Sequence, residues 1–130
     1  KESEKEIRRT ERMIKLNRYL RDLGIDEKNF YFRHDDERYT PDEDTGIPYS
    51  HTWEMSGVLA MIIYTYLMQF KETSRCSYPA FLTEEKWEEI LDTMIKGFAS
   101  IIKDEESKNA RKRQRRALDL FRKYFFCLGW

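Results

Sequence analysis

The sequence predicts an all-α fold, an irregular four-helix bundle with a long acidic loop between the first and second helices. Apolar residues recur at three- and four-residue spacing in four segments, which is the periodicity of amphipathic helices. Residues 33–48 break this pattern with two prolines, one glycine and six acids, which favours a loop. The chain has 130 residues, 40% of them hydrophobic, so we expect a single helical domain over residues 1–130.

The first predicted helix covers residues 3–23. Its narrow apolar stripe has helical spacing and consists of Met13, Leu16, Tyr19, Leu20 and Leu23. Gly24 is a natural stop for this helix. Residues 24–50 then form the long crossing segment, and its part from 33 to 44 has six acids and two arginines, a net charge of −4. A connection of this length is often functional in a compact domain.

The second predicted helix, residues 51–72, is the central one. Its apolar residues nearly circle the helix axis, so we expect burial on several sides. They are Trp53, Met55, Val58, Leu59, Met61, Ile62, Ile63, Tyr66, Leu67 and Phe70. The uncharged run at 55–70 has 16 residues, whereas a membrane span needs about 20. We therefore expect a core helix and no membrane partner.

The third predicted helix has a clear N-terminal signature. Thr83 is a good N-cap residue, and Glu84 and Glu85 in the first turn suit the helix dipole. Leu82 and Trp87 have the spacing of a hydrophobic staple. The apolar residues that follow at helical spacing are Ile90, Leu91, Met94, Ile95, Phe98, Ile101 and Ile102.

The fourth predicted helix runs from about residue 104 to about residue 127, and Gly129 ends it. Its expected inner stripe consists of Ala110, Ala117, Leu118, Phe121, Phe125 and Leu128. The last residues, 124–130, are strongly aromatic. They either pack onto the bundle or form an exposed docking site.

The net charge and the cysteines give expectations about partners and about the cellular compartment. The formal net charge is zero, so no global attraction draws the chain to nucleic acid or to an anionic membrane. The N-terminus does not resemble a secretory signal, so we expect Cys76 and Cys127 to be free thiols in a reducing compartment. Neither has a histidine nearby in sequence, and nucleophilic catalysis through them is not expected.

An enzymatic alternative rests on acids at the start of the third helix. Glu84, Glu85 and Glu88 fit the EExxE string of all-helical nucleotide pyrophosphohydrolases of the MazG type, in which helix-borne acids hold Mg²⁺ against a polyphosphate. The ExxD pair expected on a following helix is matched at residues 89–92 only on the same helix. The competing interpretation is that acids are favoured at any helix N-terminus.

A second metal candidate precedes the central helix. His51 and Glu54 lie one helical turn apart and can face one ion, with the histidine and acids of residues 34–37 as further ligands. Residues 42–46 resemble the start of a calcium loop, but Trp53 occupies the twelfth position, where a glutamate belongs. The competing interpretation is a solvated acidic loop.

A basic run at residues 108–116 is the strongest charge feature, with six basic residues and no acid. Such a run can bind phosphate backbones or an acidic partner, or it can be a solvated helix face. Because the loop at 33–44 carries the opposite charge, we also predict that the two segments pair, within one chain or between copies.

The chain also resembles a group of small uncharacterised bacteriophage proteins over about residues 47–128. The residues that carry the resemblance are Trp53, the runs at 59–63, 67–72 and 82–87, Tyr78-Pro79, and the runs at 90–98 and 117–121. This chain departs from the group at Thr52, at Ser56 and in its ending Leu128-Gly129-Trp130. The resemblance implies a viral origin and the cytoplasm of a host cell, and it carries no known function.

These observations favour a phage-type binding protein over an enzyme. We expect protein–protein binding, with a host defence component as one possible partner, or self-assembly. The expected binding residues are Asp35, Asp36, Asp42, Arg111, Arg113 and Arg115. The alternatives are the Mg²⁺-dependent pyrophosphohydrolase and nucleic-acid binding through the basic helix at 108–116.

Overall fold

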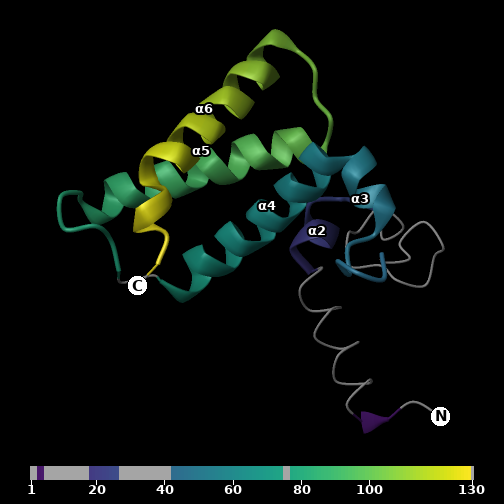
Figure 1. Cartoon of the computed structure of the whole chain (residues 1–130). Helices are drawn as coiled ribbons and strands as arrows, with labels where there is room; N and C mark the ends of the chain where they lie inside the picture. Colours follow the sequence, from purple (N-terminus) through teal and green to yellow (C-terminus); the bar gives the residue numbers. More distant parts are fainter. Residues whose placement is uncertain (1–2, 5–17, 27–41, 75–76, 130) are drawn as a thin grey trace. The chain divides into compact units, whose positions relative to one another are not determined.

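A computed structural model describes residues 3–4, 18–26, 42–74 and 77–129 of the chain (Figure 1). Every regular element in these ranges is a helix, and they contain no β-strand. The predicted all-α class is therefore confirmed for this part of the chain. Contacts divide the chain into two units, Lys1–Val58 and Leu59–Trp130, which we describe separately. The four-helix arrangement, the single domain and the full acidic loop stay predictions.

Helix α2 (Arg18–Asp22) is the described end of the first predicted helix. Gly24 has a φ of 88°, and its N–H donates to the Arg21 carbonyl at 2.9 Å. The Ile25 N–H donates to the Leu20 carbonyl at 3.0 Å. Together these bonds form the Schellman ending that a glycine in the left-handed region permits. The predicted stop at Gly24 is confirmed.

The predicted second helix is two helices, α3 (Tyr49–Trp53) and α4 (Met55–Thr73). Glu54 lies between them in a turn, and its carbonyl accepts the first helical hydrogen bond of α4 from the Val58 N–H at 3.0 Å. The single helix expected over residues 51–72 is therefore wrong. Periodicity does not detect a break of one residue, because apolar residues continue on both sides of it.

Burial of α4 on several sides is confirmed only in part. The buried apolar residues Ala60, Tyr64 and Leu67 form one stripe at helical spacing, and the buried Thr65 lies on another side of the helix. Leu59 is 46% exposed and Tyr66 is 65% exposed. Met55, the first residue of α4, and Trp53, the last residue of α3, are also mostly exposed. An apolar helix surface is buried only where a neighbour covers it, and sequence does not reveal how many neighbours exist.

The second unit is built on a helical hairpin of α5 (Glu84–Ile102) and α6 (Lys108–Tyr124), which run in opposite directions. The predicted N-cap is confirmed, since the Thr83 hydroxyl accepts from the Lys86 N–H at 3.1 Å. Ser107 caps α6 in the same way, through the Ala110 N–H at 3.1 Å. The fourth predicted helix therefore starts at residue 108 and not at 104, and the short 3₁₀ helix η3 (Phe125–Cys127) follows it.

The hairpin core follows the predicted rhythm in α5 and departs from it in α6. The core residues are Trp87, Ile90, Leu91, Met94 and Phe98 from α5, and Ala110, Ala117, Leu120 and Tyr124 from α6. Leu118 and Phe125, expected in the inner stripe, are each 50% exposed. An ion pair links α4 to α5, with Lys71 Nζ 2.5 Å from Asp92 Oδ1.

Candidate binding surface on helix α6

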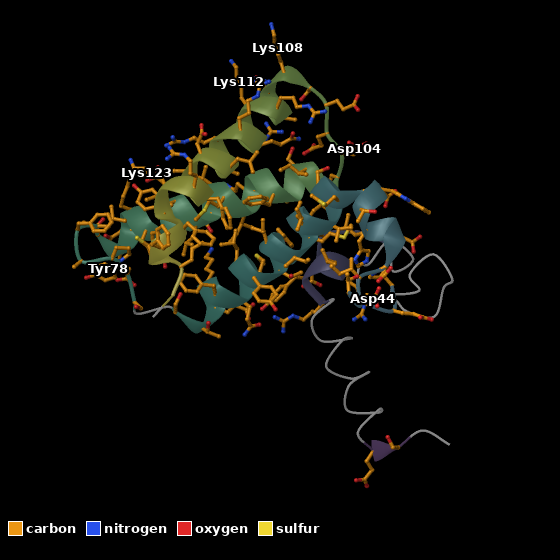
Figure 2. All side chains as sticks on the ribbon, in the orientation of Figure 1. Asp44, Tyr78, Asp104, Lys108, Lys112 and Lys123 are labelled. Atoms are coloured by element: carbon orange, nitrogen blue, oxygen red, sulfur yellow. The ribbon has the colours of Figure 1, made fainter. Side chains whose placement is uncertain are left out.

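One side of α6 is a row of exposed basic residues. Successive residues of an α-helix turn by about 100°, and the buried stripe of α6 fixes which side faces α5. The opposite side, called the outer face below, carries Lys108, Arg111, Lys112, Arg115, Asp119 and Arg122, with Leu118 at its edge, and all seven residues are exposed. Figure 2 shows Lys108 and Lys112 pointing away from the hairpin. Among the described residues, none of the five basic residues of this face forms an ion pair.

The three predicted arginines do not share one patch. Arg111 and Arg115 are four residues apart and lie together on the outer face. Arg113 is exposed but lies on the flank that approaches α5, where its carbonyl oxygen is 2.7 Å from the position of a Cβ built on Gly97. Arg111 and Arg115 can therefore contact one partner surface together.

Gln114 holds the hairpin and Arg111 in place. Its buried side-chain amide donates to the Ser100 hydroxyl at 3.1 Å and to the Glu105 carbonyl at 2.8 Å. Its carbonyl oxygen accepts from Arg111 Nη1 at 3.1 Å. Sequence reasoning counted Gln114 only as a member of the basic run. The available signal was its register, four residues after Ala110 and three before Ala117 in the buried stripe.

Four phenylalanine rings lead from the hairpin core to the surface. Phe98, 1% exposed, meets Phe121 with ring centroids 5.5 Å apart, and Phe121 meets Phe125 at 5.4 Å. Phe125 meets Phe126 at 5.5 Å, and Phe126 is 98% exposed. All three contacts are edge-to-face, the arrangement that the ring quadrupole favours. The row of rings therefore ends in Phe126, whose surface faces solvent.

The acids proposed for Mg²⁺ lie on the first two turns of α5. Glu84, Glu85 and Glu88 are exposed, and beside them Lys86 pairs with Glu89 at 3.7 Å. The described residues contain no group of three or more His, Cys, Asp or Glu side chains placed to hold a metal ion. The pyrophosphohydrolase and its Mg²⁺ stay predictions.

The candidates before α4 belong to the first unit. Asp42 organises its own turn, because its Oδ1 accepts from the Asp44 and Thr45 N–H groups at 2.9 and 3.1 Å. His51 lies in α3, partly exposed, and Glu54 is exposed in the turn that follows. Asp35 and Asp36 lie outside the described residues, and so does most of the acidic loop, so its pairing with the basic helix stays a prediction.

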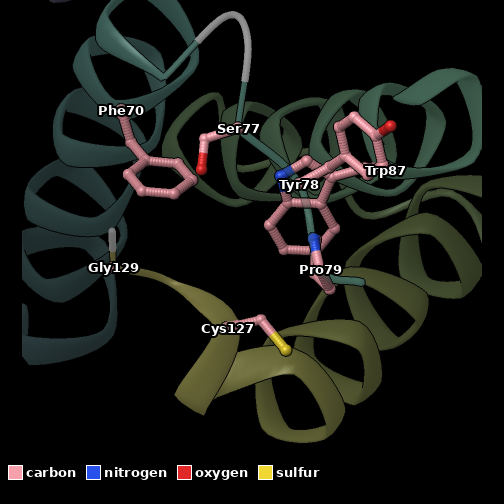
Figure 3. A pocket seen from close by; sticks show the side chains of 7 residues that line it. All are labelled: Phe70, Ser77, Tyr78, Pro79, Trp87, Cys127 and Gly129. Atoms are coloured by element: carbon pink, nitrogen blue, oxygen red, sulfur yellow. The ribbon is translucent and has the colours of Figure 1, made fainter. Parts of the chain in front are cut away.

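A cavity of about 180 Å³ lies at the end of the hairpin where α5 begins. Its wall consists of Phe70, Ser77, Tyr78, Pro79, Trp87, Cys127 and Gly129 (Figure 3). Cys127 is a free thiol, as expected, whereas Cys76 lies outside the described residues. The cavity was not predicted, since its residues come from four separate segments.

No helix in the described ranges is long and apolar enough to cross a membrane. Comparisons of the chain with family models, with curated proteins and with solved structures find no match. The resemblance to phage proteins is therefore still a prediction.

Proposed function

We propose that this chain acts by binding another protein through the outer face of α6. One observation carries the proposal: five exposed basic residues with no ion-pair partner in the described part of the chain lie along this face, and two of them, Arg115 and Arg122, are the helical neighbours of the exposed aliphatic side chain of Leu118. Arginine is enriched at protein interfaces, which combine apolar with charged contacts.

The surface is presented by a rigid element. Ser107 caps α6, Gln114 ties it to α5, and Arg111 is held by the same amide group. Side chains that are already ordered lose less conformational entropy on binding. The complementary partner surface is acidic, with an apolar patch at its edge that receives Leu118. The resemblance to phage proteins makes host cytoplasmic proteins, defence components among them, the first partners to search.

Charge reversal with a matched control tests the proposal. The double variant Arg111→Glu/Arg115→Glu and the control Lys96→Glu/Lys103→Glu change the net charge equally, and all four residues are exposed. Tagged wild-type protein captures partners from host lysate, and each captured protein is then titrated against the three forms. We expect the outer-face variant to weaken binding at least about tenfold, with the control near wild type. Equal binding by both variants would contradict the proposal.

Nucleic acid is the second candidate, because the same row of cations fits a phosphate backbone. Five phosphate contacts predict that log K for a DNA duplex falls with log salt at a slope of about −4.5. A labelled duplex titrated at several salt concentrations gives this slope. If the outer-face variant removes such binding and no protein partner is affected, the surface serves nucleic acid.

A further inference from the structure

An exposed ring and a cavity lined in part by aromatic residues occur at the same end of the hairpin. Phe126 is 98% exposed, and the next residue, Cys127, lines the cavity together with Trp87 and Tyr78 (Figure 3). Because Phe126 is almost fully exposed, it does not fill the cavity of its own chain. Its ring makes one edge-to-face contact, with Phe125 at 5.5 Å between centroids.

The cavity has the size and lining that suit one phenyl ring. Its volume is about 180 Å³. An engineered apolar protein cavity of about 150 Å³ binds benzene, whereas sites for small-molecule ligands usually have about 300–1,000 Å³. Three aromatic residues and one proline are among the lining residues, and apolar atoms supply about half of the lining surface, which an inserted ring can contact.

The charges beside the ring and beside the cavity are opposite. Lys123 precedes Phe126 by one turn and lies over the Tyr124 ring at 5.4 Å. Glu84 and Glu88 lie on the turns of α5 that flank Trp87, and both are exposed. When the cavity of one chain receives the ring of a second chain, Lys123 of the second chain approaches these acids of the first.

We propose that two copies of this chain associate by exchanging Phe126, each copy inserting its ring into the cavity of the other. Every chain has both the ring and the cavity at one end, and insertion in both directions makes the contact isologous, so that it closes as a two-fold dimer. The occupant is thus a second copy of the chain. This inference uses a different surface from the outer face of α6 and does not depend on the proposed function.

Self-association is measured by sedimentation equilibrium and by light scattering on the whole chain. We expect a species of twice the chain mass of 15.9 kDa for the wild type. Phe126→Ala raises the dimer dissociation constant at least about 100-fold, since two buried rings are lost per dimer. The matched control is Phe81→Ala, which removes a ring that is 72% exposed outside the cavity. The control leaves the dissociation constant unchanged.

A second variant, Ser77→Phe, fills the cavity from its wall and keeps Phe126. The Ser77→Phe variant alone does not dimerise. In a mixture with Phe126→Ala, the Phe126 ring of the Ser77→Phe chain enters the open cavity of the Phe126→Ala chain, which restores one of the two insertions. The mixture is therefore heavier on average than either component. Arg111→Glu/Arg115→Glu dimerises as the wild type does, which separates this inference from the proposed function. A wild type that is monomeric up to about 1 mM, or a dimer indifferent to Phe126→Ala, would overturn it.

Discussion

α5 and α6 approach each other closely at Gly97, and this contact helps to position the outer face of α6. A Cβ built on Gly97 lies 2.2 Å from the Cβ of Ala117 and 2.7 Å from the carbonyl oxygen of Arg113. Carbon atoms pack best at about 3.5–4.0 Å, so Gly97→Ala requires the helices to separate by more than about 1 Å. The Arg113 oxygen belongs to the backbone of α6 and has no rotamer in which to move away.

Two opposing terms determine how much Gly97→Ala changes the free energy of unfolding. Replacing glycine by alanine within a helix gains about 1 kcal/mol in helix propensity. Overpacking a filled core costs about 1–3 kcal/mol, and two contacts below 3.0 Å, one of them with backbone, place this site at the upper end. We therefore expect Gly97→Ala to lower the free energy of unfolding by about 2 kcal/mol.

Urea unfolding followed by far-ultraviolet circular dichroism measures this loss. Gly57→Ala is the matched control, because a Cβ on Gly57 meets no atom within 4 Å, and this variant gains up to about 1 kcal/mol. Adding Ala117→Gly to Gly97→Ala restores part of the stability, since it removes one of the two close contacts. If Gly97→Ala were as stable as the wild type, the close helix crossing would be refuted.

Two further predictions concern the polar contacts of the hairpin. Gln114→Leu lowers the free energy of unfolding by about 1–3 kcal/mol, because the Ser100 hydroxyl and the Glu105 carbonyl lose their donor. Thermal unfolding measures this loss, and an unchanged midpoint would exclude a stabilising role for these two hydrogen bonds. Ser107→Ala costs about 1 kcal/mol through loss of the α6 cap, whereas Ser107→Gly costs only a few tenths in the same urea titration; equal costs would argue against a capping hydroxyl.

Local sequence signals correctly predicted helix α5 with its N-terminal end, and the C-terminal end of α2. Thr83 and Gly24 act through hydrogen bonds to residues a few positions away, so their roles can be inferred from neighbouring sequence. The stripe from Trp87 to Phe98 is narrow and strongly periodic, and it is buried as expected. These features can be predicted because each of them involves a single helix that is covered on one side only.

The remaining errors concern what lies next to a helix. Apolar residues surround α4, but its fully buried apolar residues are Ala60, Tyr64 and Leu67, whereas Leu59 and Tyr66 are exposed. Leu118 is apolar and has helical spacing, yet it is half exposed on the outer face of α6, while the polar Gln114 takes the inner position. Which apolar residue is covered depends on the crossing at Gly97, and that contact joins residues distant in sequence.

The most direct test of the proposed function is a photo-crosslinking amino acid at residue 118. This position lies on the outer face between Arg115 and Arg122, and residue 81, also exposed but on the connector before α5, is the control position. The account predicts a discrete protein adduct from position 118 that Arg111→Glu/Arg115→Glu reduces, and no such adduct from position 81. Equal labelling from both positions, or adducts with nucleic acid alone, would contradict protein binding through this face.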